Sequence, residues 1–172
     1  MRYRMKQLFI CFFLLFFTSA LKAQLPGFPK SWEGNWKGSA IIFSARGSQS
    51  VPVSLTIEPL DRSRWSWILY YDAPNQNPRK YELIQDDTGW KIDEKNGVVL
   101  PQQIIGGRLA SGFSVEGSLL VCYYWLEGEV LNMEIHTVAL HQNNTATTET
   151  GEPTAVSTHS VGTFQKAKLY RK

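Results

Sequence analysis

The feature of this chain that most restricts its fold is the alternation of apolar and polar residues with a period of two. Between Val51 and Glu58, four aliphatic side chains alternate without a break with proline, serine, threonine and glutamate. Alternate residues of a β-strand point to opposite faces, so this pattern is typical of a strand with one buried face. The same pattern predicts about ten strands, at residues 36–44, 51–58, 64–71, 79–85, 90–93, 98–100, 104–115, 118–126, 129–140 and 157–171.

Short turns separate these predicted strands, and most of them contain glycine, as in Asp87-Thr88-Gly89 and Asn96-Gly97. Glycine supplies the positive φ angles of tight antiparallel hairpins, whereas parallel strands need long crossover connections. Closing such a meander into a barrel removes the exposed strand edges that an open sheet would leave. We therefore expect an all-β fold, a single antiparallel meander barrel of about eight to ten strands.

Two stretches of the sequence depart from this pattern of strands joined by short turns. Gly106-Gly107 interrupts an apolar run, which predicts a bulge or a sharp bend at a barrel corner. Residues 141–156 are polar and rich in threonine, and they predict a long loop that is either a flexible tip or a lid over the barrel mouth.

The N-terminal segment has the order of a secretory signal. Arg2, Arg4 and Lys6 precede an apolar run from Leu8 to Phe17, and small residues follow up to Ala23-Gln24. The run is about ten residues long, whereas a membrane-spanning helix needs about 20. We therefore expect residues 1–23 to be a cleaved signal peptide, residues 24–172 to form one domain, and the protein to be periplasmic or secreted, without a membrane anchor.

Removal of this segment changes the charge of the protein. It carries four basic residues and no acid, so residues 24–172 hold 14 basic and 15 acidic side chains. Nucleic acids and anionic lipids are bound by clustered cations, and a near-neutral net charge predicts no nucleic-acid partner.

Cys122 is the only cysteine outside the signal, and its apolar neighbours indicate a buried residue rather than a nucleophile.

The segment Ser31-Trp32-Glu33-Gly34-Asn35-Trp36-Lys37-Gly38 stands where the first strand begins. A glycine-any-tryptophan motif at this place, up-and-down strands after it and a basic residue on the last strand resemble the lipocalin-like or calycin β-barrel superfamily and small secreted bacterial proteins. The resemblance implies that Trp36 closes one end of the barrel, with Gly34 and Gly38 in the motif. It also implies that a last-strand cation, Arg171 or else Lys168, stacks on that tryptophan.

Aromatic residues are the main functional indication. Trp65, Trp67 and Tyr71 share one strand face, and Tyr123 and Trp125 repeat the arrangement on a later strand. In a small barrel such a face points inward, where rings either fill the core or line a pocket, while outward rings would stack on sugars. Glu134 and His136, in phase on their strand, are the first polar groups expected inside such a pocket.

The remaining chemistry-bearing residues give weaker indications. His136 and His141 lie on opposite strand faces, so no metal site is predicted. The nitrobindin-like branch of the superfamily holds haem through a histidine on a late strand, and that resemblance makes His159 the residue to test as a haem ligand. The acidic residues lie at turns and no serine stands in a nucleophile elbow, so we expect no catalytic residues and no enzymatic activity.

These observations predict a non-catalytic, exported binding module for a small apolar or amphipathic molecule, without a cofactor. The alternative is a structural or protein-interaction barrel with a packed interior, and haem or carbohydrate binding is a further possibility. An interior cavity above roughly 300 Å³ would favour ligand binding, and a solid interior would favour interaction with a protein partner.

Overall fold

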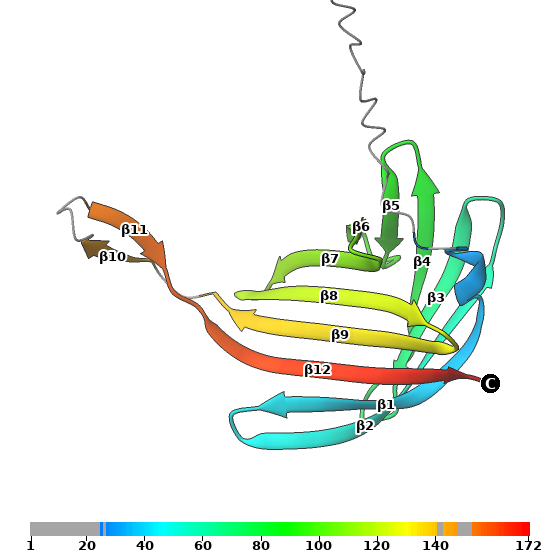
Figure 1. The fold of residues 1–172 in the computed structure, drawn as a ribbon, viewed down its shortest axis with the longest axis horizontal. Coiled ribbons are helices and arrows are strands. Elements are labelled where there is room, and N and C mark those ends of the chain that lie inside the picture. Colours follow the sequence, from blue (N-terminus) through cyan, green and yellow to red (C-terminus); the bar gives the residue numbers. More distant parts are fainter. Residues whose placement is uncertain (1–24, 26, 141–142, 148–152) are drawn as a thin grey trace, which may run out of the picture.

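Ten antiparallel strands close into a barrel in the computed structural model of the chain (Figure 1). The structure describes residue 25 and residues 27–140, 143–147 and 153–172. Around the barrel the strands follow the order β1-β12-β9-β8-β7-β6-β5-β4-β3-β2, so every neighbouring pair but β9-β12 and β1-β12 is consecutive in the chain. The bounds of the barrel strands are β1 Gly34–Ser44, β2 Gly47–Pro59, β3 Arg64–Tyr71, β4 Arg79–Asp86, β5 Gly89–Asp93, β6 Val99–Ile105, β7 Arg108–Val115, β8 Ser118–Glu127, β9 Val130–Ala139 and β12 Ser160–Arg171.

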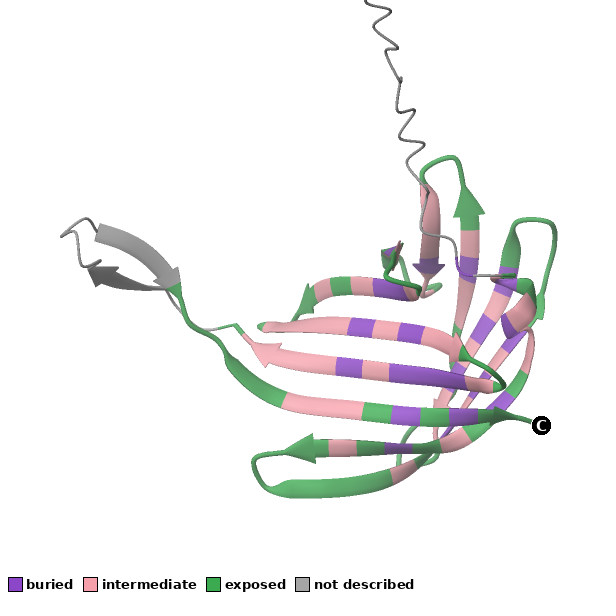
Figure 2. Ribbon diagram, viewed as in Figure 1, coloured by how far each residue is buried: buried purple, intermediate pink, exposed green. Residues whose placement is uncertain are grey.

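The predicted fold class, an all-β antiparallel meander barrel, is confirmed, and the burial of its strands follows the alternation in the sequence. In β2, Val53, Leu55 and Ile57 are buried, and the residues between them are not. Figure 2 shows the same banding of buried and less buried residues on most strands of the barrel. The core is therefore the barrel interior, filled by one face of each strand.

Two local expectations are wrong. Gly106 and Gly107 form the turn between β6 and β7, with φ angles of 55° and 74°, rather than a bulge within one strand. Two adjacent residues with positive φ are what a tight hairpin turn requires. The polar stretch after β9 contains a second small sheet, in which β10 (Asn143–Thr147) pairs with β11 (Pro153–Ser157). In Figure 1 this hairpin extends away from the barrel.

Several sequence predictions lie outside the described residues. These are the signal segment, residues 1–23, and the parts of the polar stretch at residues 141–142 and 148–152. Among the described residues, no helix is long and apolar enough to cross a membrane.

One end of the barrel is plugged by the segment before β1. The short 3-10 helix η1 (Lys30–Trp32) places Trp32 in the core, where it is 1% exposed. The Trp36 indole nitrogen donates a hydrogen bond to the Trp32 carbonyl oxygen at 2.7 Å. Phe28 packs edge-on against both Trp32 and Trp90, with ring centroids 4.8 Å apart in each pair. Large rings therefore fill this end of the barrel.

Candidate functional site

The motif residues of the first and last strands meet at the plugged end. The Arg171 guanidinium lies 4.4 Å from the centre of the Trp36 ring, which is fully buried. It also donates to the backbone carbonyl of Glu33, and at 2.9 Å to that of Ser31. A flat guanidinium stacks on an indole while its edge donates hydrogen bonds, which an ammonium does less well. Lys168, the second candidate cation, lies in the row where β12 pairs with Ser39 and Asn132.

Gly38 is required by the close approach of β1 and β12. A Cβ atom placed on it would lie 2.1 Å from the carbonyl oxygen of Lys168, a backbone atom that has no freedom to move aside. Gly34 has a φ of 129°, and a Cβ there would lie 3.0 Å from the Arg171 guanidinium. The motif glycines therefore let the backbone and Arg171 pack closely around Trp36.

The opposite end of the barrel opens into a cavity of about 330 Å³, which we call the cup. Its walls come from the inward faces of strands on both sides of the barrel and from the β3-β4 loop. The lining residues are Ile42, Gln49, Val51, Tyr71, Ala73, Gln76, Arg79, Leu120, Ile135 and Gln165. This volume exceeds the roughly 300 Å³ at which ligand pockets begin.

A second, narrower cavity of about 80 Å³ adjoins the cup inside the barrel. Arg79, Leu120 and Ile135 line both spaces. Towards the middle of the barrel the narrow cavity reaches Trp67 and Tyr124, whose rings pack edge-on with centroids 5.2 Å apart. The interior is therefore hollow at the open end and becomes packed towards the plug.

Tyr71 supplies a partly buried hydroxyl to the wall of the cup. Its hydroxyl donates to the Gln165 side-chain oxygen at 2.9 Å, and the Arg79 guanidinium lies 5.9 Å from its ring centre. Burial raises the pKa of Tyr71 to about 12, so the hydroxyl keeps its proton at neutral pH. Among the described residues, no carboxylate forms an ion pair with Arg79. The cup thus combines an apolar wall with one cation and several neutral polar groups.

Three of the predicted wall residues face the barrel interior, but they do not share one pocket. Trp65 belongs to the plug, where its indole nitrogen donates to the Glu33 carboxylate at 3.0 Å and its ring lies 5.8 Å from that of Trp90. Trp67 lines the narrow cavity, and Tyr71 lines the cup. The face they share runs from the plugged end to the open end, so each ring meets a different environment.

The other four predicted residues, Tyr123, Trp125, Glu134 and His136, lie on the outer face of β8 and β9, so the inward placement was wrong. On β8 the inward residues are Leu120, Cys122 and Tyr124, and on β9 they are Met133 and Ile135. The physical reason is that residues 119–125 are apolar or aromatic on both faces, so alternation alone does not fix which face turns inward. Cys122, on the inner face, has its pKa raised to about 11 by burial, as expected of an unreactive thiol.

The structure nevertheless brings these four residues together, around Arg108 of β7. The Arg108 guanidinium lies 4.1 Å from the Trp125 ring centre and 5.9 Å from that of Tyr123, and it pairs with Glu134 at 3.4 Å. His136 packs against Tyr123 on one side and stacks on Phe164 on the other, at centroid distances of 6.4 and 4.8 Å. The sequence prediction missed Arg108, because a basic residue beside a turn carries no signal of such a role.

Sequence reasoning also missed four polar residues of the cup, Arg79, Gln49, Gln76 and Gln165. For those that belong to strands, the position in the strand alternation could have indicated that they face inward. Arg79 lies on the same strand face as Tyr81 and Leu83, and Gln165 lies on the same face as Ala167 and Leu169. His159, the predicted haem-ligand candidate, lies in the exposed connection between β11 and β12 and does not line the cup. Among the described residues, no group of three or more potential ligand side chains is arranged to hold a metal ion.

Comparison with known proteins supports the fold alone. No protein-family model matches the chain, and no curated protein matches it. Among solved structures, the chain is similar to a protein of unknown function of the DUF3598 family from Nostoc punctiforme PCC 73102, with a TM-score of 0.57 and 12% sequence identity. The similarity covers 87% of this chain and 49% of the other, so this chain spans about half the length of that protein.

Proposed function

We propose that this protein is a non-catalytic binding module that holds one small apolar or amphipathic molecule in the cup. The observation that carries the proposal is the asymmetry of the barrel. Trp32 and Trp36 fill one end, while the other end opens into about 330 Å³ of space between inward-facing side chains. A concave, mostly apolar pocket with a few polar groups is the usual form of a small-molecule site.

The lining of the cup indicates how such a molecule would lie. Ile42, Val51, Leu120 and Ile135 offer aliphatic contacts. The polar groups lie among them, since Gln49 and Gln165 are the cross-strand neighbours of Ile42. Tyr71, Gln76 and Arg79 supply the other polar groups. Burial of apolar surface contributes about 25 cal/mol per Å² to the binding free energy, and the free-energy cost of immobilising the ligand reduces this gain. Micromolar affinity is attainable for a molecule that fills the cup.

We also propose that the barrel belongs to the lipocalin-like or calycin superfamily. The stacking of Arg171 on Trp36 supports this, together with the hydrogen bonds from Arg171 to the segment before β1. The ten-stranded order is compatible with it, and the similarity to the Nostoc protein concerns the barrel fold only.

Export is part of the proposal and rests on the order of residues 1–23. We expect the mature protein to begin near Gln24, in the periplasm or outside the cell, without an attached lipid. Intact-mass analysis of the exported fraction tests this. A species that retains Met1, or one that carries the mass of an acyl chain, would contradict it.

Titration with a hydrophobic fluorescent probe tests ligand binding. N-phenyl-1-naphthylamine is expected to bind one site per chain with micromolar affinity, measured by its emission and by calorimetry. Gln49→Trp places an indole in the mouth of the cup and is expected to abolish saturable binding. The matched control is Gln103→Trp, because Gln103 is exposed on β6 and is not among the residues of the cup. Parent protein that fails to saturate, or equal binding by both variants, would refute the proposal.

A further inference from the structure

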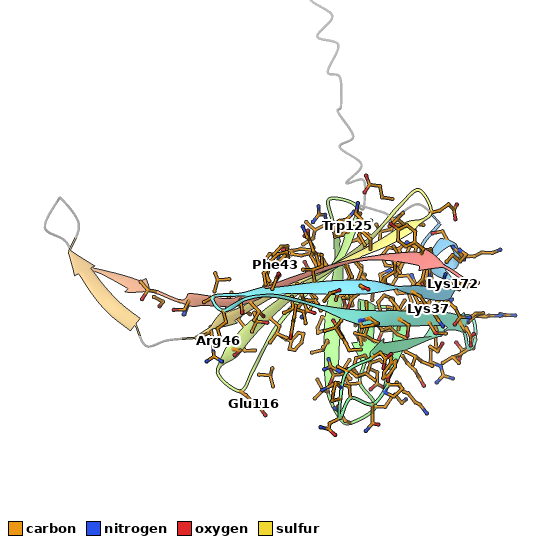
Figure 3. All side chains as sticks on the ribbon, turned by 90° about the horizontal axis from the view of Figure 1, so that it is seen from below. Lys37, Phe43, Arg46, Glu116, Trp125 and Lys172 are labelled. Atoms are coloured by element: carbon orange, nitrogen blue, oxygen red, sulfur yellow. The ribbon has the colours of Figure 1, made fainter. Side chains whose placement is uncertain are left out.

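The outer face of β1, β12, β9 and β8 carries a groove of about 390 Å³ that the cup does not explain. We call it the outer groove, and its side chains include Ile41, Trp125, Asn132, Glu134, Lys166 and Lys168. Trp125 and Phe43, a residue near one end of this face, are labelled in Figure 3. Because residues of opposite phase line the cup, the outer groove and the cup lie on opposite faces of the same strands.

The strand register explains why the surface is hollowed here. Ser39, Lys168, Asn132 and Trp125 are cross-strand neighbours and form one row over four strands. The next row contains Ile41, Lys166, Glu134 and Tyr123. Serine and asparagine are short, so a dip forms between the longer side chains, and it reaches Met133 and Ala167, which belong to the opposite face.

Trp125 forms a supported aromatic wall of the outer groove. Arg108, from β7, stacks on the indole at 4.1 Å, and Glu134 holds that guanidinium at 3.4 Å. β7 and β9 flank β8 on opposite sides, so the Arg108 side chain crosses β8 beside Trp125 to reach Glu134 on β9. An indole held in this way has a fixed orientation beside the groove and loses little entropy when a ligand packs on it.

The charges of the outer groove favour an anion. Among the described residues, no acidic side chain forms an ion pair with Lys166 or Lys168. Lys166 lies 5.5 Å from the ring centre of Phe43. The one carboxylate of the groove, Glu134, is paired with Arg108. Although residues 24–172 have a near-neutral net charge, folding places two lysines in the same groove as an indole, and neither has an ion-pair partner among the described residues.

The polar groups favour a sugar over a peptide. A peptide that docks on a sheet commonly adds a strand to an exposed edge, and a closed barrel offers none. A sugar ring instead packs its C–H face on an indole, and its hydroxyls pair with polar side chains such as Ser39 and Glu134. We propose that the outer groove binds a carboxylated sugar, a uronate, with Trp125 as the stacking platform and Lys166 and Lys168 as the carboxylate partners.

Calorimetric titration with trigalacturonate at low salt tests this proposal, which does not depend on ligand binding in the cup. Trigalacturonate is expected to bind, and its methyl ester, which lacks the charges, is expected to bind much more weakly. Trp125→Ala is expected to weaken binding by on the order of ten-fold or more. Lys168→Gln is expected to weaken it by about three-fold to five-fold, since exposed charge pairs contribute about 1 kcal/mol or less.

Control variants separate binding in the outer groove from binding elsewhere on the barrel. Lys80→Gln removes an exposed lysine of β4, far from the groove in strand order, and is expected to leave affinity unchanged, as is Gln49→Trp in the cup. Trp125→Phe keeps a ring and is expected to retain part of the affinity. Free galacturonate that binds as tightly as the trimer identifies a single uronate as the ligand, and tighter binding of the trimer identifies a polysaccharide chain.

Three results would overturn the proposal. They are the absence of trigalacturonate binding, equal binding of the methyl ester, and an unchanged affinity in Lys168→Gln. Binding to phosphatidylglycerol vesicles that requires Trp125, without binding to trigalacturonate, would assign the outer groove to an acidic membrane surface instead.

Discussion

At the scale of single residues, the close approach of β1 and β12 near the plugged end depends on the absence of a side chain at Gly38. Gly38 pairs with Leu169 on β12 and with Val53 on β2, and its missing side chain lets the β12 backbone approach. The sequence predicted a role for this glycine only through its position in the motif. The contact that makes it necessary, with the carbonyl oxygen of Lys168, joins residues far apart in the chain and no local pattern reveals it.

Gly38→Ala is therefore expected to lower the free energy of unfolding by about 1 to 3 kcal/mol, the usual cost of forcing extra atoms into a packed site. Gly112→Ala is the matched control, because a Cβ there would lie 3.8 Å from the Leu120 carbonyl oxygen, which is an ordinary van der Waals contact. It is expected to change stability by no more than about 0.5 kcal/mol. Urea denaturation of both variants measures the difference, and equal midpoints would contradict the role given to Gly38.

At the scale of elements, the strands were predictable and the direction in which some of them face was not. β2 and β3 carry one clearly apolar face, and their inward residues could be read from the sequence. β8 has large apolar side chains on both faces, so Tyr123 and Tyr124 compete for the interior. Pairing with Leu109 and Met133 turns Tyr124 inward, and such cross-strand packing is not visible in one strand's sequence.

The plug formed by η1 and the start of β1 is expected to be a main source of stability. Trp36→Ala should cost about 3 to 5 kcal/mol, because it removes a fully buried ring and leaves a cavity. Trp125→Ala is the control with the same side chain on the outer face, and its cost should be much smaller. Thermal and urea unfolding measure both, and a Trp36→Ala variant as stable as Trp125→Ala would refute this role of the plug.

At the scale of the whole molecule, the two ends of the barrel differ in structure, and so do its inner and outer faces. The plugged end stabilises the fold through Trp32, Trp36 and Arg171, and the open end provides the cup. The number of barrel strands and their meander order followed from alternation and turn chemistry, whereas the β10-β11 hairpin did not. The polar lining of the cup and the outer groove did not, because each is assembled from residues on strands that are distant in the sequence.

Mapping the probe titration onto individual residues tests the central claim, a ligand site in the cup, most directly. Two-dimensional ¹H–¹⁵N spectra of the protein titrated with N-phenyl-1-naphthylamine report each backbone amide separately. Binding in the cup predicts saturable shifts at Tyr71, Ala73, Gln76 and Gln165, which line it, and none that saturate at Trp125. Shifts confined to the outer face, or a spectrum that the probe leaves unchanged, would contradict a ligand site in the cup.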